Sequence, residues 1–174
     1  MQAPTHILAG VAIQKALTGV KPRALALGLT ATLAFLSHGI LDKLAKATYH
    51  PPAPDFRSSF WIGYHLAVLL ATIVLLYFWW RQFRWGIALA VLPDLDWVFI
   101  HGQEIFHFQI PFYRQPHLHH LLQFILQWPP VTYLDRLPNN RHHPWSCLWE
   151  LLLMAVLLVA GRFLTGRAVR RRSS

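Results

Sequence analysis

One long apolar run without Asp, Glu, Lys or Arg constrains this chain more than any other feature of its sequence. The run covers residues 59–80, with Trp61 near one end and the pair Trp79 and Trp80 at the other. Tryptophan gathers at the two membrane–water interfaces, and about 20 apolar residues are enough for a helix to cross the bilayer. The run therefore predicts a membrane-spanning helix.

Further apolar segments extend this prediction to the whole chain. They are residues 5–17, 23–43, 85–101 and 145–164. The first is short for a span, and it is expected to be either a buried helix or a re-entrant one. We expect an all-α, polytopic helical membrane protein with four or five membrane segments and a short amphipathic outer helix at residues 117–128. Residues 1–166 would form a single helical membrane domain and residues 167–174 a basic C-terminal tail.

The composition favours a membrane partner over nucleic acid. Only 13% of the residues are charged, against about 25% in ordinary soluble domains. The net charge is +9, but the basic residues lie between or after apolar runs and no nucleic-acid-binding motif accompanies them. We therefore expect membrane lipid as a partner and no nucleic acid. Cys147 is the only cysteine, which excludes an intramolecular disulfide and a cysteine-based zinc cluster.

The distribution of basic residues predicts an orientation, because cytoplasmic loops carry an excess of Lys and Arg. Ten of the sixteen basic residues fall on one side if the C-terminus is cytoplasmic: Lys15, Lys21, Arg23, Arg81, Arg84, Arg162, Arg167, Arg170, Arg171 and Arg172. We expect a multi-pass protein of the cell (inner) membrane, with its C-terminus inside and its N-terminus outside or dipping in from the outside.

Several ionisable residues lie inside or at the ends of the apolar segments. They are His6, His38, Asp42, Asp94 and Asp96. An ionisable group at bilayer depth costs roughly 2.5–3.5 kcal/mol on insertion scales, so it needs a partner, a metal ion or a water-filled cavity. These residues are therefore the first candidates for a functional site.

Two of the segments predict that some of these residues meet. Segments 5–17 and 23–43 are joined by a turn at Lys21 and Pro22, and they should form an antiparallel hairpin that brings His6, His38 and Asp42 to one membrane face. His38 and Asp42 are four residues apart and share a helix face, about 6 Å from each other. They could bind one metal ion together, or form a simple His–Asp pair that caps a helix end near water.

Pro93 predicts a break in the segment 85–101, with a new helix starting just after it. Asp94 and Asp96 then lie in the first turn of the new helix, and broken helices at membrane depth commonly form binding sites. Residues two apart point to different sides of a helix. We therefore expect Asp94 to be a metal ligand and Asp96 to support it or to act as the catalytic general base. In the alternative interpretation, both aspartates cap the restarted helix and face water.

Three histidines follow Pro116. His117 and His120 share a helix face and are further candidate ligands, whereas His119 is expected to point away. In the alternative interpretation, they form an interfacial cluster without metal. The complete candidate set offers only nitrogen and oxygen atoms, which suits zinc as the default and manganese or iron as alternatives.

At these residues the sequence resembles a family of small bacterial and archaeal membrane proteins described as membrane-bound metal-dependent hydrolases. This family is related to the LexA-binding, inner membrane-associated hydrolases. The resemblance rests on four short pieces within roughly residues 1–125: Thr5–Gly10, Leu36–Asp42, Leu92–Asp96 and His117–His120. It implies a helical membrane protein with a metal-binding polar cluster.

Three functions follow as hypotheses. The first is a metal-dependent hydrolase at the outer membrane face that acts on a lipid-like or phosphoester substrate. The second is a non-catalytic integral membrane subunit or scaffold that packs against other protein subunits of a membrane complex. The third, a transporter that uses the broken helix, is the least favoured because the chain has few spans and no inverted repeat.

Overall fold

The computed structural model describes residues 1–51, 55–111, 113 and 115–170, and within this part of the chain every regular element is a helix. The long helices are α1 (Ala3–Leu17), α2 (Arg23–Leu44), α3 (Ser59–Val91), α4 (Leu95–Phe106) and α8 (Cys147–Arg170). The short helices are α5 (His117–Leu121), α6 (Gln123–Leu126) and α7 (Pro129–Thr132), with 3-10 turns η1 (Ala45–Ala47), η2 (Leu92–Asp94), η3 (Tyr133–Arg136) and η4 (Pro144–Ser146). The expected all-helical fold is confirmed for these residues.

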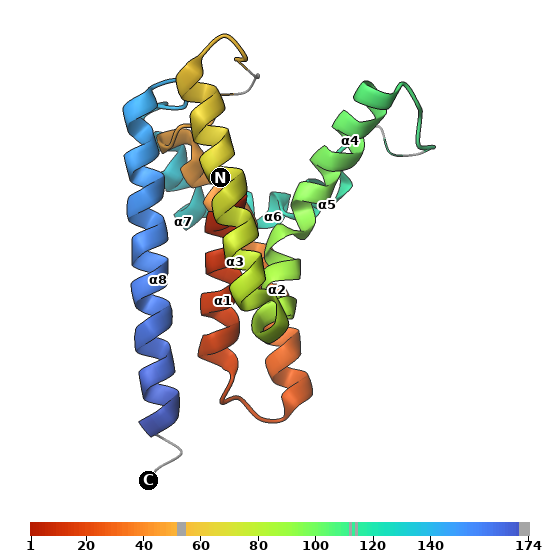
Figure 1. Ribbon diagram of the computed structural model, residues 1–174. Coiled ribbons are helices and arrows are strands. Elements are labelled where there is room, and N and C mark those ends of the chain that lie inside the picture. The colour runs from red at the N-terminus through yellow and green to blue at the C-terminus, as the bar shows by residue number, and fades with distance from the viewer. Residues whose placement is uncertain (52–54, 112, 114, 171–174) are drawn as a thin grey trace.

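Helix α1 occupies the centre of the bundle. It packs against α2, α3 and α8, and the α1–α2 turn lies at the same end of the molecule as the C-terminal end of α8 (Figure 1). Helix α4 extends away from the other long helices (Figure 1). A helix at the centre of a membrane bundle is shielded from lipid by its neighbours, and so it can carry polar side chains that a lipid-facing helix cannot.

Helix α3 reverses direction at Phe83, where the backbone leaves helical geometry (φ −123°, ψ 27°). Before this residue the chain runs along α1 toward its C-terminal end, since the Lys15 ammonium lies over the Trp79 ring. After it the chain returns, so that Ala90 packs beside Gly10. The second half of α3 thus leads back toward the N-terminal end of α1.

Three stretches are long and apolar enough to cross a membrane: Arg23–Ala47, Ser59–Gln103 and Pro144–Leu164. This is fewer than the four or five expected. Helix α1 has only 15 residues, which is too short to span. The segments 59–80 and 85–101, expected as two, belong to one continuous helical stretch that is bent at Phe83. The helix expected at residues 117–128 is instead divided into the short helices α5 and α6.

A close backbone crossing joins α1 to the second half of α3. A Cβ atom added to Gly10 would lie 2.2 Å from the Gly86 carbonyl oxygen, and one added to Gly86 would lie equally close to the Gly10 carbonyl. Small residues allow membrane helices to approach this closely. The buried side chains of Ile7, Phe83 and Ile87 pack beside the crossing. The glycine pair therefore fixes how near the two helices can come.

Replacement of Gly10 by alanine should destabilise the fold by about 1–3 kcal/mol, because the new methyl group would collide with backbone atoms that have no room to move aside. The measurement is the midpoint of thermal unfolding in detergent. Gly28→Ala is the matched control, since nothing lies within 4 Å of its added methyl group. Equal midpoints for the Gly10 and Gly28 variants would contradict the tight crossing.

Candidate metal centre

Five ionisable side chains from four elements meet beside the N-terminal end of α1. They form two overlapping groups, His6–His38–Asp42 and His38–Asp94–His119. In each group the three candidate ligand atoms lie within 4.8 Å of one another. The structure thus brings together four of the six expected ligands, and it adds His119.

The α1–α2 hairpin positions the floor of this cluster. The His6 and His38 rings are stacked, with centroids 4.0 Å apart and planes at 16°, and both side chains are fully buried. Asp42 lies one turn after His38. Its Oδ1 is 3.4 Å from His6 Nε2, and its Oδ2 is 3.0 Å from His38 Nε2. One carboxylate therefore faces both imidazoles.

The protonation of His38 follows from its other nitrogen. Nδ1 lies 2.8 Å from the Ala90 carbonyl oxygen, which can only accept a hydrogen bond, so Nδ1 carries the proton. In the neutral ring, Nε2 then presents a lone pair toward Asp42 and toward Asp94 Oδ1, which is 3.7 Å away. A positive charge between this nitrogen and the two carboxylates, supplied by a proton or by a metal ion, would stabilise the arrangement.

Buried nitrogen atoms in the cluster lack hydrogen-bond partners. Among the described residues, His38 Nε2 and both ring nitrogens of His6 make no hydrogen bond. An unsatisfied buried polar group costs about 1–3 kcal/mol. The α-amino group of Met1 lies 3.0 Å from Asp42 Oδ1, but it does not satisfy these nitrogens.

His119 closes the cluster from α5. Its Nε2 lies 3.5 Å from Asp42 Oδ2, and its Nδ1 lies 3.0 Å from Asp96 Oδ2. Burial of the ring lowers the pKa of His119, but the neighbouring Asp42 and Asp96 carboxylates outweigh this effect and raise the pKa above its ordinary value. The indole N–H of Trp97 donates to His119 Nε2 at 3.3 Å. In the neutral ring this nitrogen is the acceptor, and Nδ1 carries the proton that Asp96 accepts.

Asp96 lies behind His119 and is fully buried. It accepts hydrogen bonds from the Tyr113 hydroxyl, from the His119 backbone N–H at 2.8 Å and from His119 Nδ1. A carboxylate that binds the far nitrogen of a ligand histidine fixes the orientation of the ring. The expected catalytic role of Asp96 therefore fits this geometry poorly, because its oxygens are occupied and inaccessible to water. The geometry instead suits a residue that positions His119.

The histidines after Pro116 are arranged differently from the expectation. His117 and His120 lie outside both candidate metal groups, and His119 takes part instead. The His117 ring packs against Tyr113, with centroids 5.1 Å apart, and the exposed His120 ring meets Gln123. The reason is that Asp96 binds both the backbone and the side chain of His119, which turns this one histidine of the short helix inward.

Glu150 is a buried acid that the sequence analysis did not select. Its carboxylate accepts hydrogen bonds from the Gln2 backbone N–H, the Thr5 hydroxyl and the Tyr64 hydroxyl, at 2.8, 2.8 and 3.0 Å. These bonds tie α8 and α3 to the first turn of α1, directly beside His6. The sequence signal that could have identified Glu150 is its position as the only acid in the apolar segment 145–164.

The separations between donor atoms suit a transition-metal ion. Ligand atoms about 2.0–2.1 Å from a tetrahedral zinc ion lie about 3.3 Å from one another. The nitrogen–oxygen separations here are 3.0, 3.4, 3.5 and 3.7 Å. The cluster is buried on the histidine side and open on the carboxylate side, where the Asp42 and Asp94 side chains are 31% and 38% exposed. A ligand set with one accessible side is typical of catalytic rather than structural sites.

Comparison of the chain with protein-family models, with curated proteins and with solved structures finds no match. The resemblance to membrane-bound metal-dependent hydrolases therefore remains a hypothesis based on the short sequence pieces alone.

Proposed function

We propose that this chain is a membrane-embedded, metal-dependent hydrolase that acts at the outer membrane face on a lipid-like or phosphoester substrate. The observation that carries the proposal is the cluster of imidazole and carboxylate groups in which buried nitrogens lack hydrogen-bond partners. The nitrogen and oxygen donors suit zinc first, and manganese or iron as alternatives.

Each residue has a separate role in this proposal. His6, His38, Asp42 and His119 would hold the ion, which when bound would lower the pKa of a water molecule and polarise a phosphoryl or carbonyl oxygen. Asp94 lies at the open side, where its carboxylate can accept a proton from the attacking water. Asp96 holds the Nδ1 proton of His119 and so directs Nε2 toward Asp42.

The surroundings of the open side favour an apolar substrate. The Trp97 ring contacts the His119 ring at a tilt, with ring centroids 5.4 Å apart, and Trp97 is 44% exposed. A substrate with an acyl chain beside its phosphoester would place the chain against Trp97 and the ester among the carboxylates.

The first test measures metal in the purified full-length protein and hydrolysis of fluorescent phospholipid and aryl phosphoester substrates. We expect about one metal equivalent, with metal and hydrolysis both lost in His38→Ala and His119→Ala. His120→Ala is the matched control and should keep both. Metal-free wild-type protein, or equal metal contents in the His119 and His120 variants, would contradict the proposed centre. Bound metal without hydrolysis of any substrate would support the metal centre but contradict the proposed hydrolase activity.

The second test concerns the positioning role of Asp96. Asp96→Asn should weaken zinc affinity about 10–100-fold, the usual effect of removing the carboxylate that orients a ligand histidine. Competition with a chelator of known affinity measures the dissociation constant, and the melting midpoint of the metal-free protein reports on folding separately. Asp135→Asn removes an exposed partner of Lys43 and should leave the zinc affinity unchanged. An unaltered dissociation constant for Asp96→Asn would remove Asp96 from the site.

A non-catalytic membrane subunit is the second candidate, and the course of α4 favours it. This helix extends away from the bundle (Figure 1), and Val98 and Phe106 on it are 62% and 74% exposed. Such a helix could pack against another subunit within the membrane. A stable larger assembly on native gels, together with metal-free protein, would support this function over the hydrolase.

We further propose the orientation that the basic residues predict. The C-terminus would lie in the cytoplasm, and the cluster would lie toward the outer face of the inner membrane. The reason is that Lys15, Arg81 and Arg162 lie in segments that reach the opposite end from the cluster. A reporter enzyme that works only in the cytoplasm should be active when it is fused to the C-terminus, and one that works only outside the inner membrane should be inactive there. The opposite result would show that the orientation is inverted.

A further inference from the structure

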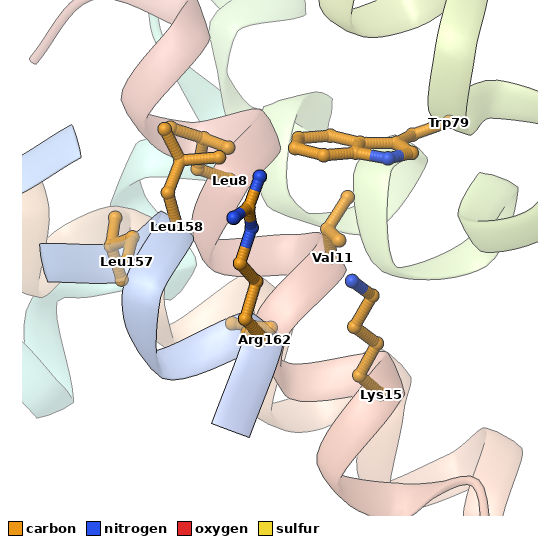
Figure 2. Close-up of a pocket in the computed structure, with 9 residues that line it drawn as sticks. Leu8, Val11, Lys15, Trp79, Leu157, Leu158 and Arg162 are labelled. Carbon is orange, nitrogen blue, oxygen red and sulfur yellow. The ribbon is translucent and has the colours of Figure 1, made fainter. Parts of the chain in front are cut away.

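A lateral pocket opens between α1, α3 and α8, separate from the His–Asp cluster. Its volume is about 260 Å³. The apolar part of its wall includes Leu8, Leu157 and Leu158, and the basic part consists of Lys15 and Arg162 (Figure 2). Figure 2 shows the charged ends of Lys15 and Arg162 pointing into the same space below the Trp79 ring. The pocket therefore combines an apolar surface with two positive charges.

No acid of the described part of the chain neutralises these charges. The pocket lining contains no carboxylate, and the ion pairs among the described residues involve neither Lys15 nor Arg162. Instead, the Lys15 ammonium lies over the aromatic rings of Trp79 and Phe83, 5.6 and 5.2 Å from their centroids. Cation–π contacts hold the ammonium in place and leave its charge available to an anion.

The basic part of the pocket lies toward the end of the bundle that is opposite to the start of α1. Lys15 belongs to the last turn of α1, nine residues after His6, which corresponds to about 13 Å along the helix. This end also carries the α1–α2 turn (Figure 1) and the arginines that flank Phe83. The two charges therefore lie on the side of the α1–α2 turn relative to the His–Asp cluster, and Leu8, two residues after His6, lies between them and the cluster.

The two basic side chains come from neighbouring helices. A Cβ atom added to Gly161 of α8 would lie 3.9 Å from Lys15 Nζ, an ordinary contact distance, so the ammonium of α1 lies beside the α8 backbone. Arg162 follows directly and is exposed at its outer edge. A guanidinium and an ammonium that converge from two helices match the several oxygens of one phosphate group.

We propose that this pocket binds an anionic phospholipid, with its phosphate between Lys15 and Arg162 and an acyl chain along Leu8 and Leu158. Basic pockets between membrane helices recognise such headgroups. The apolar wall favours an amphiphile over free phosphate, because inorganic phosphate would leave Leu8, Leu157 and Leu158 unused. The site stands apart from the metal centre and does not depend on hydrolysis.

The test titrates detergent-purified full-length protein with phosphatidylglycerol, phosphatidylcholine and inorganic phosphate, and follows lipid adducts by native mass spectrometry. Phosphatidylglycerol should bind most tightly, and inorganic phosphate should not compete for it at equal concentration. The double substitution Lys15→Gln/Arg162→Gln should weaken phosphatidylglycerol binding about 30-fold, roughly fivefold for each charge. Arg84→Gln removes an exposed positive charge outside the pocket, that of the arginine over the Trp85 ring, and this control should leave binding unchanged.

A second variant separates a loss of lipid binding from a loss of folding. Leu158→Trp keeps both charges and fills the apolar wall, and its side chain starts 38% exposed, so the fold should tolerate it. This variant should also lose phosphatidylglycerol adducts while its melting midpoint stays near the wild-type value. Equal binding of phosphatidylcholine and phosphatidylglycerol, full competition by inorganic phosphate, or unchanged binding in both variants would each overturn the lipid site.

Discussion

The close contact between α1 and the returning half of α3 is the constraint on which the rest of the structure depends. Gly10 and Gly86 bring the two backbones together, and this contact places Ala90 where its carbonyl oxygen can bind His38 Nδ1. It also directs the chain so that Pro93 and Asp94 reach the N-terminal end of α1. Without this crossing, Asp94 would have no reason to lie near His38, and no shared centre would form.

The acidic side chains of the cluster and the basic side chains of the pocket lie toward opposite ends of the bundle. Three acids of the apolar segments gather with His6, His38 and His119 beside the start of α1, and Glu150 binds the backbone and side chain next to them. The opposite end carries basic side chains and aromatic rings. An ionisable group in a membrane bundle is tolerated where it has partners. The histidines have the carboxylates of the cluster, and Lys15 at the opposite end has the Trp79 and Phe83 rings.

The sequence alone predicted the helical class and the meeting of segments that are far apart in the chain. A hairpin with a turn near Pro22 necessarily brings His6 near His38, and a helix broken at Pro93 exposes Asp94 at its end. The only sequence signal for the reversal at Phe83 is the short charged gap between the apolar runs 59–80 and 85–101. The role of His119 could not be predicted, because a five-residue helix has no periodicity to define its faces, and its rotation depends on the distant Asp96. Glu150 has partners on α1 and α3, and such contacts leave no local pattern.

The most direct measurement of the central claim is anomalous X-ray scattering at the zinc edge, recorded from crystals of the full-length protein grown with zinc. The account predicts one dominant peak, within coordination distance of His38 Nε2 and Asp42 and adjacent to His6 and His119. An absent peak, or a peak found only at the surface histidines His142 and His143, would contradict a metal centre built from these residues.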